Sequence, residues 1–289
     1  MMHRCFAGIL LFVCAWAAWP QAPVNGQSQF RLLDIKDGLP SLSVNAIAQD
    51  RTGYLWVGTK DGLARFDGGG FKVFRHIQGD PQSMRSNYVQ AVHVDRLNRI
   101  WVGIEGYGVY RFDPDRETFT RLDLLPGNAG AVLDIWAISS DRQGSVWFGS
   151  FGQGLFRLKP DGKVRQYLPK QGVAGLPDEN VLSLAQDKRG RLWIATSSGI
   201  VQWQNERFIA FNNEALVSKV VITLMPDSDA SMWLGTQAGL DHALPDGRIE
   251  HPAWNQQLSD PRIMAVLAEP DGARWFVARS GLNRLSQGK

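Results

Sequence analysis

The pattern of apolar and polar residues divides most of the chain into short segments that repeat. Residues 53–66 show the unit, which is a turn glycine, an apolar run around Trp56, a loop that ends in glycine, and a second short apolar run. Apolar runs of this length between glycine-rich turns predict β-strands. The same unit recurs around five more tryptophans, at Trp101, Trp147, Trp193, Trp233 and Trp275.

The spacing of these units predicts the architecture. The six tryptophans follow one another at intervals of 40 to 46 residues, which is close to the ~40–45 residues of a four-stranded propeller blade. We therefore predict an all-β fold, a β-propeller with six four-stranded antiparallel blades over residues 30–289. Each unit opens with an apolar strand, expected at residues 44–49, 89–94, 135–140, 181–186, 221–226 and 263–268.

The last unit is shorter than the others. Five units carry a segment for a fourth strand, whereas the sixth ends after its third strand, at residues 282–285. The residues Phe30-Arg31-Leu32-Leu33 resemble the missing strand. We expect them to pair with residues 282–285 and to close the ring, because such pairing removes two exposed sheet edges.

Three residue columns recur with the blades, and we interpret all of them as structural. The tryptophans are expected to pack between neighbouring blades. A small residue in each first strand fits a crowded inner position, at Ala46, Ala91, Ala137, Ser183, Thr223 and Ala265. An acidic residue six positions before each tryptophan is expected to cap its own turn instead of binding calcium, at Asp50, Asp95, Asp141, Asp187, Asp227 and Glu269.

The N-terminal residues predict export. A short basic start up to Arg4 precedes an apolar run at residues 5–18, and Ala15-Trp16-Ala17 has the small-x-small pattern of a cleavage site. This is typical of a secretory signal peptide. Because fourteen residues fall short of the ~20 that span a bilayer, we expect a signal peptide at 1–18, a flexible connector at 19–29, and no transmembrane helix in the mature chain. The protein would then be periplasmic or secreted.

Composition excludes several classes of function. The formal net charge of +3 is spread without runs, which disfavours binding to nucleic acid or to an anionic membrane. Both cysteines, Cys5 and Cys14, lie in the predicted signal peptide, so the mature chain would lack disulfides and cysteine metal sites. The remaining histidines show no ligand spacing, and we expect no metal and no cofactor.

The loops between second and third strands are the candidate ligand-binding residues. They are short and chemically varied on an otherwise constant template, and propellers bind ligands on the face that such loops form around the central channel. We expect a small-molecule or oligosaccharide ligand there, although any single residue can also be a solvated turn position. The candidates are Lys60, Asp61, Glu105, Tyr107, Phe151, Gln153, Ser197, Ser198, Gln237 and Arg279.

The repeat resembles a known family. The unit at 50–66, its second copy at 186–200 and the lead-in at 175–181 are similar to the two-component regulator propeller repeat. The resemblance implies a non-catalytic extracytoplasmic sensor that works with a membrane-bound histidine kinase or diguanylate cyclase. The family usually builds seven blades, and the last two units here depart from its pattern at Ala243 and Val277. The chain is then either a stand-alone sensor or the front of a longer receptor.

Other classes of function remain open from the sequence. Residues 139–147 are close to the Asp-box of sialidase propellers but have one residue too many between Asp141 and Gly144. Streptogramin-lyase propellers have similar Gly-x-x-Trp repeats. A protein–protein scaffold that uses the long inter-blade loop at 76–87 is the third alternative. No acid, base and nucleophile converge by motif, so we assign no catalytic residue.

Overall fold

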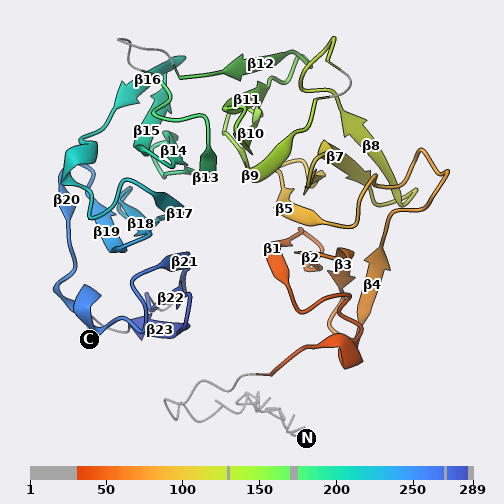
Figure 1. Ribbon diagram of the computed structural model, residues 1–289, viewed down its shortest axis with the longest axis horizontal. Coiled ribbons are helices and arrows are strands. Elements are labelled where there is room, and N and C mark those ends of the chain that lie inside the picture. The colour runs from red at the N-terminus through yellow and green to blue at the C-terminus, as the bar shows by residue number, and fades with distance from the viewer. Residues whose placement is uncertain (1–30, 129–130, 170–174, 270–271, 286–289) are drawn as a thin grey trace, which may run out of the picture. The chain divides into compact units, whose positions relative to one another are not determined.

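The computed structural model describes residues 31–128, 131–169, 175–269 and 272–285. Within them the chain forms six antiparallel sheets in sequence order, five with four strands and the last with three. The sheets surround a central opening, and the first strand of each lies innermost (Figure 1). The predicted all-β, six-bladed propeller is confirmed. The predicted signal peptide and connector lie outside the described residues.

The strands follow the predicted positions closely. The innermost strands are β1 (Val44–Gln49), β5 (Val89–Val94), β9 (Asp134–Ser140), β13 (Val181–Gln186), β17 (Val221–Pro226) and β21 (Ile263–Ala268). The second strands are β2 (Leu55–Thr59), β6 (Ile100–Ile104), β10 (Val146–Phe151), β14 (Leu192–Thr196), β18 (Met232–Thr236) and β22 (Arg274–Ala278). The third strands are β3 (Gly62–Phe66), β7 (Gly108–Asp113), β11 (Leu155–Leu158), β15 (Gly199–Gln204), β19 (Gly239–Ala243) and β23 (Gly281–Leu285). The fourth strands are β4 (Phe71–Phe74), β8 (Thr118–Leu122), β12 (Val164–Tyr167), β16 (Arg207–Ala210) and β20 (Ile249–Glu250).

The structure differs from the prediction at the N-terminal strand. No strand is assigned to residues 31–33, and the sixth sheet contains only β21, β22 and β23 among the described residues. Phe30 lies outside them. Asp34 and Asp37 form a capping box that starts the 3₁₀ helix η1 (Ile35–Asp37) immediately after this segment. The pairing of this segment with residues 282–285 is therefore not formed by the described residues.

The tryptophans of the first five blades pack against the following blade, as predicted. Trp147 of the third blade is fully buried, and its ring centroid lies 5.4 Å from that of Trp203 in the fourth. Trp56 of the first blade lies 5.1 Å from Phe112 of the second. Burying rings of this size supplies much of the apolar surface that joins one sheet to the next.

A glycine in the second strand sets how closely the next blade approaches. A Cβ added to Gly103 would lie 2.8 Å from the carbonyl oxygen of Ile135, and one added to Gly149 would lie 2.5 Å from a methyl group of Val181. Gly103 also pairs with Ala91, a member of the small-residue column. Both columns are small because the innermost strand of the following blade packs against them.

The first and sixth blades each expose one apolar face that the others bury. Val44 is 41% exposed, whereas Val89 at the same place in β5 is fully buried. In the sixth blade Leu267 is 63% exposed, whereas Met225 at the same place in β17 is buried. Val277, also exposed, stands where most blades have the close-contact glycine. Among the described residues, no innermost strand of a following blade covers Val277.

Candidate functional site

The predicted ligand-binding residues lie at one end of the propeller. Each is in, or directly beside, a connection between a second and a third strand. The backbone of these loops is fixed to the residue before the innermost strand of the same blade: Lys60 N–H donates to the carbonyl of Ser43 at 3.3 Å, and Glu105 N–H donates to that of Tyr88 at 3.0 Å. The repeat thus presents the variable side chains from a constant frame.

Two of the predicted residues mainly hold their own loops. The carboxylate of Asp61 accepts hydrogen bonds from Arg75 Nη2 at 3.0 Å and from Asn87 Nδ2 at 3.1 Å. The hydroxyl of Ser198 donates to Asp178 Oδ2 at 2.8 Å. Their polar groups are already partnered, so they are weaker candidates for ligand contact than the others.

The remaining polar candidates point to solvent or to aromatic rings. Lys60 Nζ lies 5.8 Å from the centre of the Tyr88 ring, a cation–π contact. Among the described residues, the other polar side chains donate and accept no side-chain hydrogen bond, which leaves their groups available to a ligand. They are Glu105, Gln153, Ser197, Gln237 and Arg279.

An exposed aromatic pair stands out on this end of the third blade. Phe151, at the end of β10, stacks on Trp136 of β9 with centroids 5.1 Å apart and an angle of 23° between the planes. Trp136 is 45% exposed and Phe151 is 47% exposed. Tyr107 in the second blade is also exposed. Large contiguous patches of exposed apolar side chains are typical of interaction surfaces.

Sequence reasoning missed Trp136. The signal was present, because the second position of the innermost strand is otherwise a polar or aliphatic residue, such as Asn45, Gln90 or Leu182. Trp136 follows Ile135 in β9, and only the pairing of β9 with β10 places Trp136 beside Phe151.

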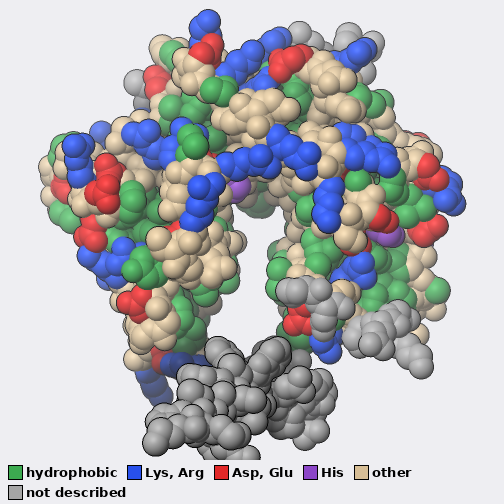
Figure 2. Space-filling view, turned by 180° about the vertical axis from the view of Figure 1, so that it is seen from behind, with side chains coloured by type: hydrophobic (Ala, Val, Ile, Leu, Met, Phe, Trp, Pro, Cys, Tyr) green, Lys and Arg blue, Asp and Glu red, His purple; other side chains and the backbone are tan. Residues whose placement is uncertain are grey.

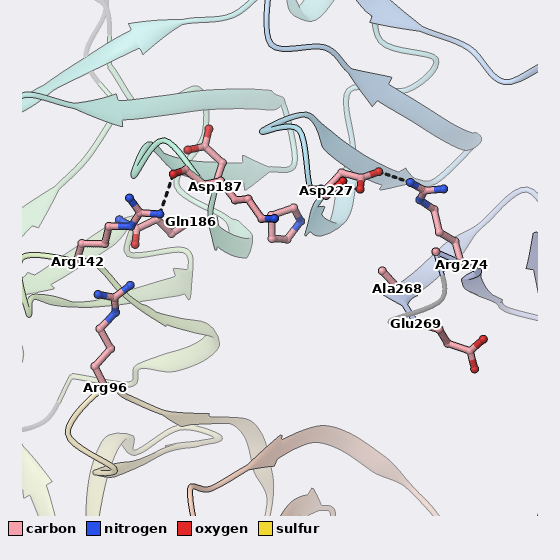
Figure 3. Close-up of a pocket in the computed structure, with 12 residues that line it drawn as sticks. Arg96, Arg142, Gln186, Asp187, Asp227, Ala268, Glu269 and Arg274 are labelled. Carbon is pink, nitrogen blue, oxygen red and sulfur yellow. Dashed lines mark hydrogen bonds and ion pairs between the residues drawn. The ribbon is translucent and has the colours of Figure 1, made fainter. Parts of the chain in front are cut away.

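The opposite end of the propeller holds a pocket of about 490 Å³. It is formed by turns between first and second strands, and Figure 3 shows that its labelled residues come from several blades. Arg96, Arg142 and Asp187 lie on one side in Figure 3, and Asp227, Glu269 and Arg274 lie on the other. Lys188 also lines the pocket. Sequence reasoning did not single out this end.

A buried carboxylate contacts a histidine in the fifth blade. His251 Nδ1 lies 2.6 Å from Oδ1 of the buried Asp241. Burial raises the pKa of Asp241, against hydrogen bonds from the Val217 N–H and from His251. Neither residue lines the pocket of about 490 Å³. No group of three or more His, Cys, Asp or Glu residues in the described ranges is placed to hold a metal ion.

No helix within the described part of the chain is long and apolar enough to cross a membrane.

Comparison with known proteins gives matches to signalling proteins and to an enzyme. A stretch of 60 residues is 45% identical to histidine kinase P4 of Formosa agariphila. This stretch is 21% of this chain and 4% of the kinase. An extracellular domain assigned to the hybrid two component system BT3049 of B. thetaiotaomicron superposes with a TM-score of 0.56 at 21% identity, over 89% of this chain and 41% of that one. Virginiamycin B lyase from Staphylococcus aureus superposes with a TM-score of 0.64 at 16% identity, over 85% of this chain and 81% of the lyase.

At this low identity the structural matches show the fold alone, and they do not assign an activity to this chain. The chain spans only a small part of the kinase and less than half of the extracellular domain. The family model for the two component regulator propeller matches residues 38–61 and 175–198, which lie in the first and fourth blades. Two segments of this propeller, in the first and fourth blades, therefore match the repeat of the two component regulator propeller family.

Proposed function

We propose that this chain is the extracytoplasmic ligand-sensing module of a bacterial signal-transduction system and is not catalytic by itself. The family repeat and the similarity to histidine kinase P4 support a role in signalling. The predicted signal peptide at residues 1–18 supports export to the periplasm or beyond. The partner is a membrane-bound histidine kinase or diguanylate cyclase.

The observation that carries a binding role is the exposed stack of Trp136 on Phe151. It lies at the end of the propeller formed by the loops between second and third strands, with Gln153 in the loop directly after Phe151 and Glu105 in the corresponding loop of the second blade. Aromatic faces bind apolar faces of a ligand, and a few polar groups beside them fix its orientation. A small molecule or an oligosaccharide fits this combination.

Binding to a panel of neutral oligosaccharides tests the proposal. We expect the wild-type protein to bind at least one member of the panel. Trp136→Ala and Phe151→Ala should each weaken binding of that oligosaccharide at least tenfold, without lowering the melting temperature. Leu97→Ala is the matched control, because Leu97 is exposed in a turn between first and second strands, at the other end. Equal affinity of wild type and both aromatic variants would exclude the aromatic pair as the binding surface.

A turnover assay separates this proposal from an enzymatic one. The purified protein is incubated with a streptogramin B antibiotic, a sialoside and a sugar lactone, and the products are followed by mass spectrometry. We expect no turnover of any of them. Turnover that a single substitution at the candidate loops abolishes would favour a lyase or hydrolase over a sensor.

A further inference from the structure

A row of basic side chains lies at the end of the propeller opposite to the proposed ligand face. In each of the first four blades the residue after the turn-capping aspartate is basic, and in the fifth it is Ser228. Because all these turns connect a first to a second strand, the side chains meet at one end of the channel. Figure 2 shows Lys and Arg side chains in a row along the rim of the central opening. The basic row consists of Arg51, Arg96, Arg142 and Lys188.

Contacts between blades hold this row together. Arg142 Nη2 donates to the backbone carbonyl of Lys188 in the next blade at 2.7 Å. The guanidinium of Arg51 donates in the same way to the carbonyl of Arg96. These bonds orient the side chains of Arg142 and Arg51 but satisfy only part of their guanidinium groups, each of which has five N–H donors. Arg96, Arg142 and Lys188 all line the pocket of about 490 Å³ (Figure 3).

The acidic residues of the pocket do not neutralise this row, because each is paired elsewhere. Asp187 accepts from Arg191 Nε at 2.6 Å. Asp227 is paired with Arg274, and Glu269 with Arg284.

The basic residues, in contrast, form no ion pair within the part of the chain that the structure describes. Arg142 donates to a backbone carbonyl, and Arg96 and Lys188 are exposed. A pocket with unneutralised cations on one wall attracts anions, since a cleft concentrates the field of the charges that line it. Its volume falls within the ~300–1,000 Å³ of ordinary small-molecule sites.

We propose that this pocket binds a small anion that carries two or more carboxylate or phosphate groups. Two guanidinium groups and an ammonium group on successive blades match a ligand with separated negative groups, and arginine binds such oxyanions through paired N–H donors. The site is distinct from the proposed ligand face, lies at the opposite end of the channel, and does not depend on the sensing role.

Isothermal titration of the full propeller with citrate and with pyrophosphate tests the site. We expect binding of at least one of them at low ionic strength, weakening as NaCl is added. Citrate alone would identify carboxylate chemistry and pyrophosphate alone phosphate chemistry. Arg96→Gln and Lys188→Gln should each weaken binding by roughly two- to fivefold, the effect of losing one exposed charge pair. The double variant should weaken binding by about tenfold.

Arg116→Gln is the matched control, because Arg116 is an exposed arginine in the turn between β7 and β8 that does not line the pocket. It should leave the affinity unchanged, and all variants should melt at the temperature of wild type. Failure of both anions to bind at low ionic strength would overturn the proposal. If Arg116→Gln weakened binding as much as the pocket variants, the proposal would also be overturned. The effect would then come from the net charge of the protein and not from the pocket.

Discussion

The indole Nε1 of Trp147 donates a hydrogen bond of 2.8 Å to Oδ2 of Asp141, six residues earlier in the chain. The other carboxylate oxygen of Asp141 accepts the backbone N–H of Ser145 at 2.8 Å and so caps the turn between β9 and β10. One aspartate therefore ties the hairpin turn to the ring that packs against the next blade. Four other blades repeat the bond, in the pairs Trp56–Asp50, Trp101–Asp95, Trp193–Asp187 and Trp233–Asp227.

This relationship predicts two separable costs at Trp147. Trp147→Ala should lower the free energy of unfolding by about 3–5 kcal/mol, because it leaves a cavity between two blades. Trp147→Phe keeps much of the ring but removes the donor to a buried carboxylate, at a cost of about 1–3 kcal/mol. Chemical denaturation measures both. Trp136→Phe is the control, since Trp136 is exposed. If Trp147→Ala left stability unchanged but abolished binding, the tryptophan would belong to a ligand site.

The second prediction concerns the close approach of blades at Gly103. Gly103→Ala should destabilise the protein by about 1–3 kcal/mol, as overpacking of a tight contact does, because its Cβ would lie 2.8 Å from the Ile135 carbonyl oxygen. Gly70→Ala is the matched control, since a Cβ there meets nothing within 4 Å. Thermal unfolding of both variants decides the matter. Equal melting temperatures would show that the blades can separate slightly without cost.

The third prediction is a pH dependence of stability from His93. Burial lowers the pKa of His93 to about 4, partly offset by the charge of Asp95. In the unfolded chain the pKa is about 6.5, so between these two values the unfolded state binds more protons than the folded one. The free energy of unfolding is therefore undiminished by His93 above pH 6.5. As the pH falls towards 4, protonation of His93 in the unfolded chain lowers this free energy by a total of about 3 kcal/mol.

Urea denaturation at pH 7 and at pH 4.5 measures this loss. His93→Gln keeps a polar side chain beside Ser140, whose hydroxyl lies 3.0 Å from His93 Nε2, but it cannot titrate. We expect the variant to lose less stability than wild type between the two pH values. Identical losses would show that other groups carry the pH dependence in this window.

A separate carboxylate effect is expected at lower pH. Burial opposes ionisation of Asp227, but hydrogen bonds from the Ser228 N–H, the Trp233 indole and Arg274 hold its pKa at about 2. Because this pKa is depressed, the stability it contributes is present above about pH 4 and is lost as the pH falls towards 2. Asp227→Asn should remove this loss below pH 4, as followed by tryptophan fluorescence during acid titration.

The fifth prediction is cleavage of the signal peptide. Expression of the whole chain in a Gram-negative host should give an exported protein that begins after Ala17 or Ala18, as N-terminal sequencing would show. Replacing Ala15 and Ala17 by leucine should block processing, because the peptidase requires small residues at these positions. Recovery of wild-type protein that still begins at Met1 would contradict export by cleavage.

The sequence alone determined the blades. Strand, turn and tryptophan repeat at a fixed spacing, and each hairpin depends on neighbours within about twenty residues. For this reason β1, β5, β13, β17 and β21 begin and end where the pattern predicted. Capping by the aspartates was equally local and equally predictable. No strand is assigned to residues 31–33, where the pattern predicted one.

The tertiary structure decided which side chains meet. Trp136 and Phe151 lie on different strands, and only the register of β9 against β10 stacks them. Arg96, Arg142 and Lys188 each have the pattern of an ordinary solvated turn residue, about 46 positions from the next. Their common pocket exists because the blades are arranged around one axis, which brings equivalent turns together. The repeat predicted that ring, but the distances between the turns depend on packing between sheets, which no local pattern of residues encodes.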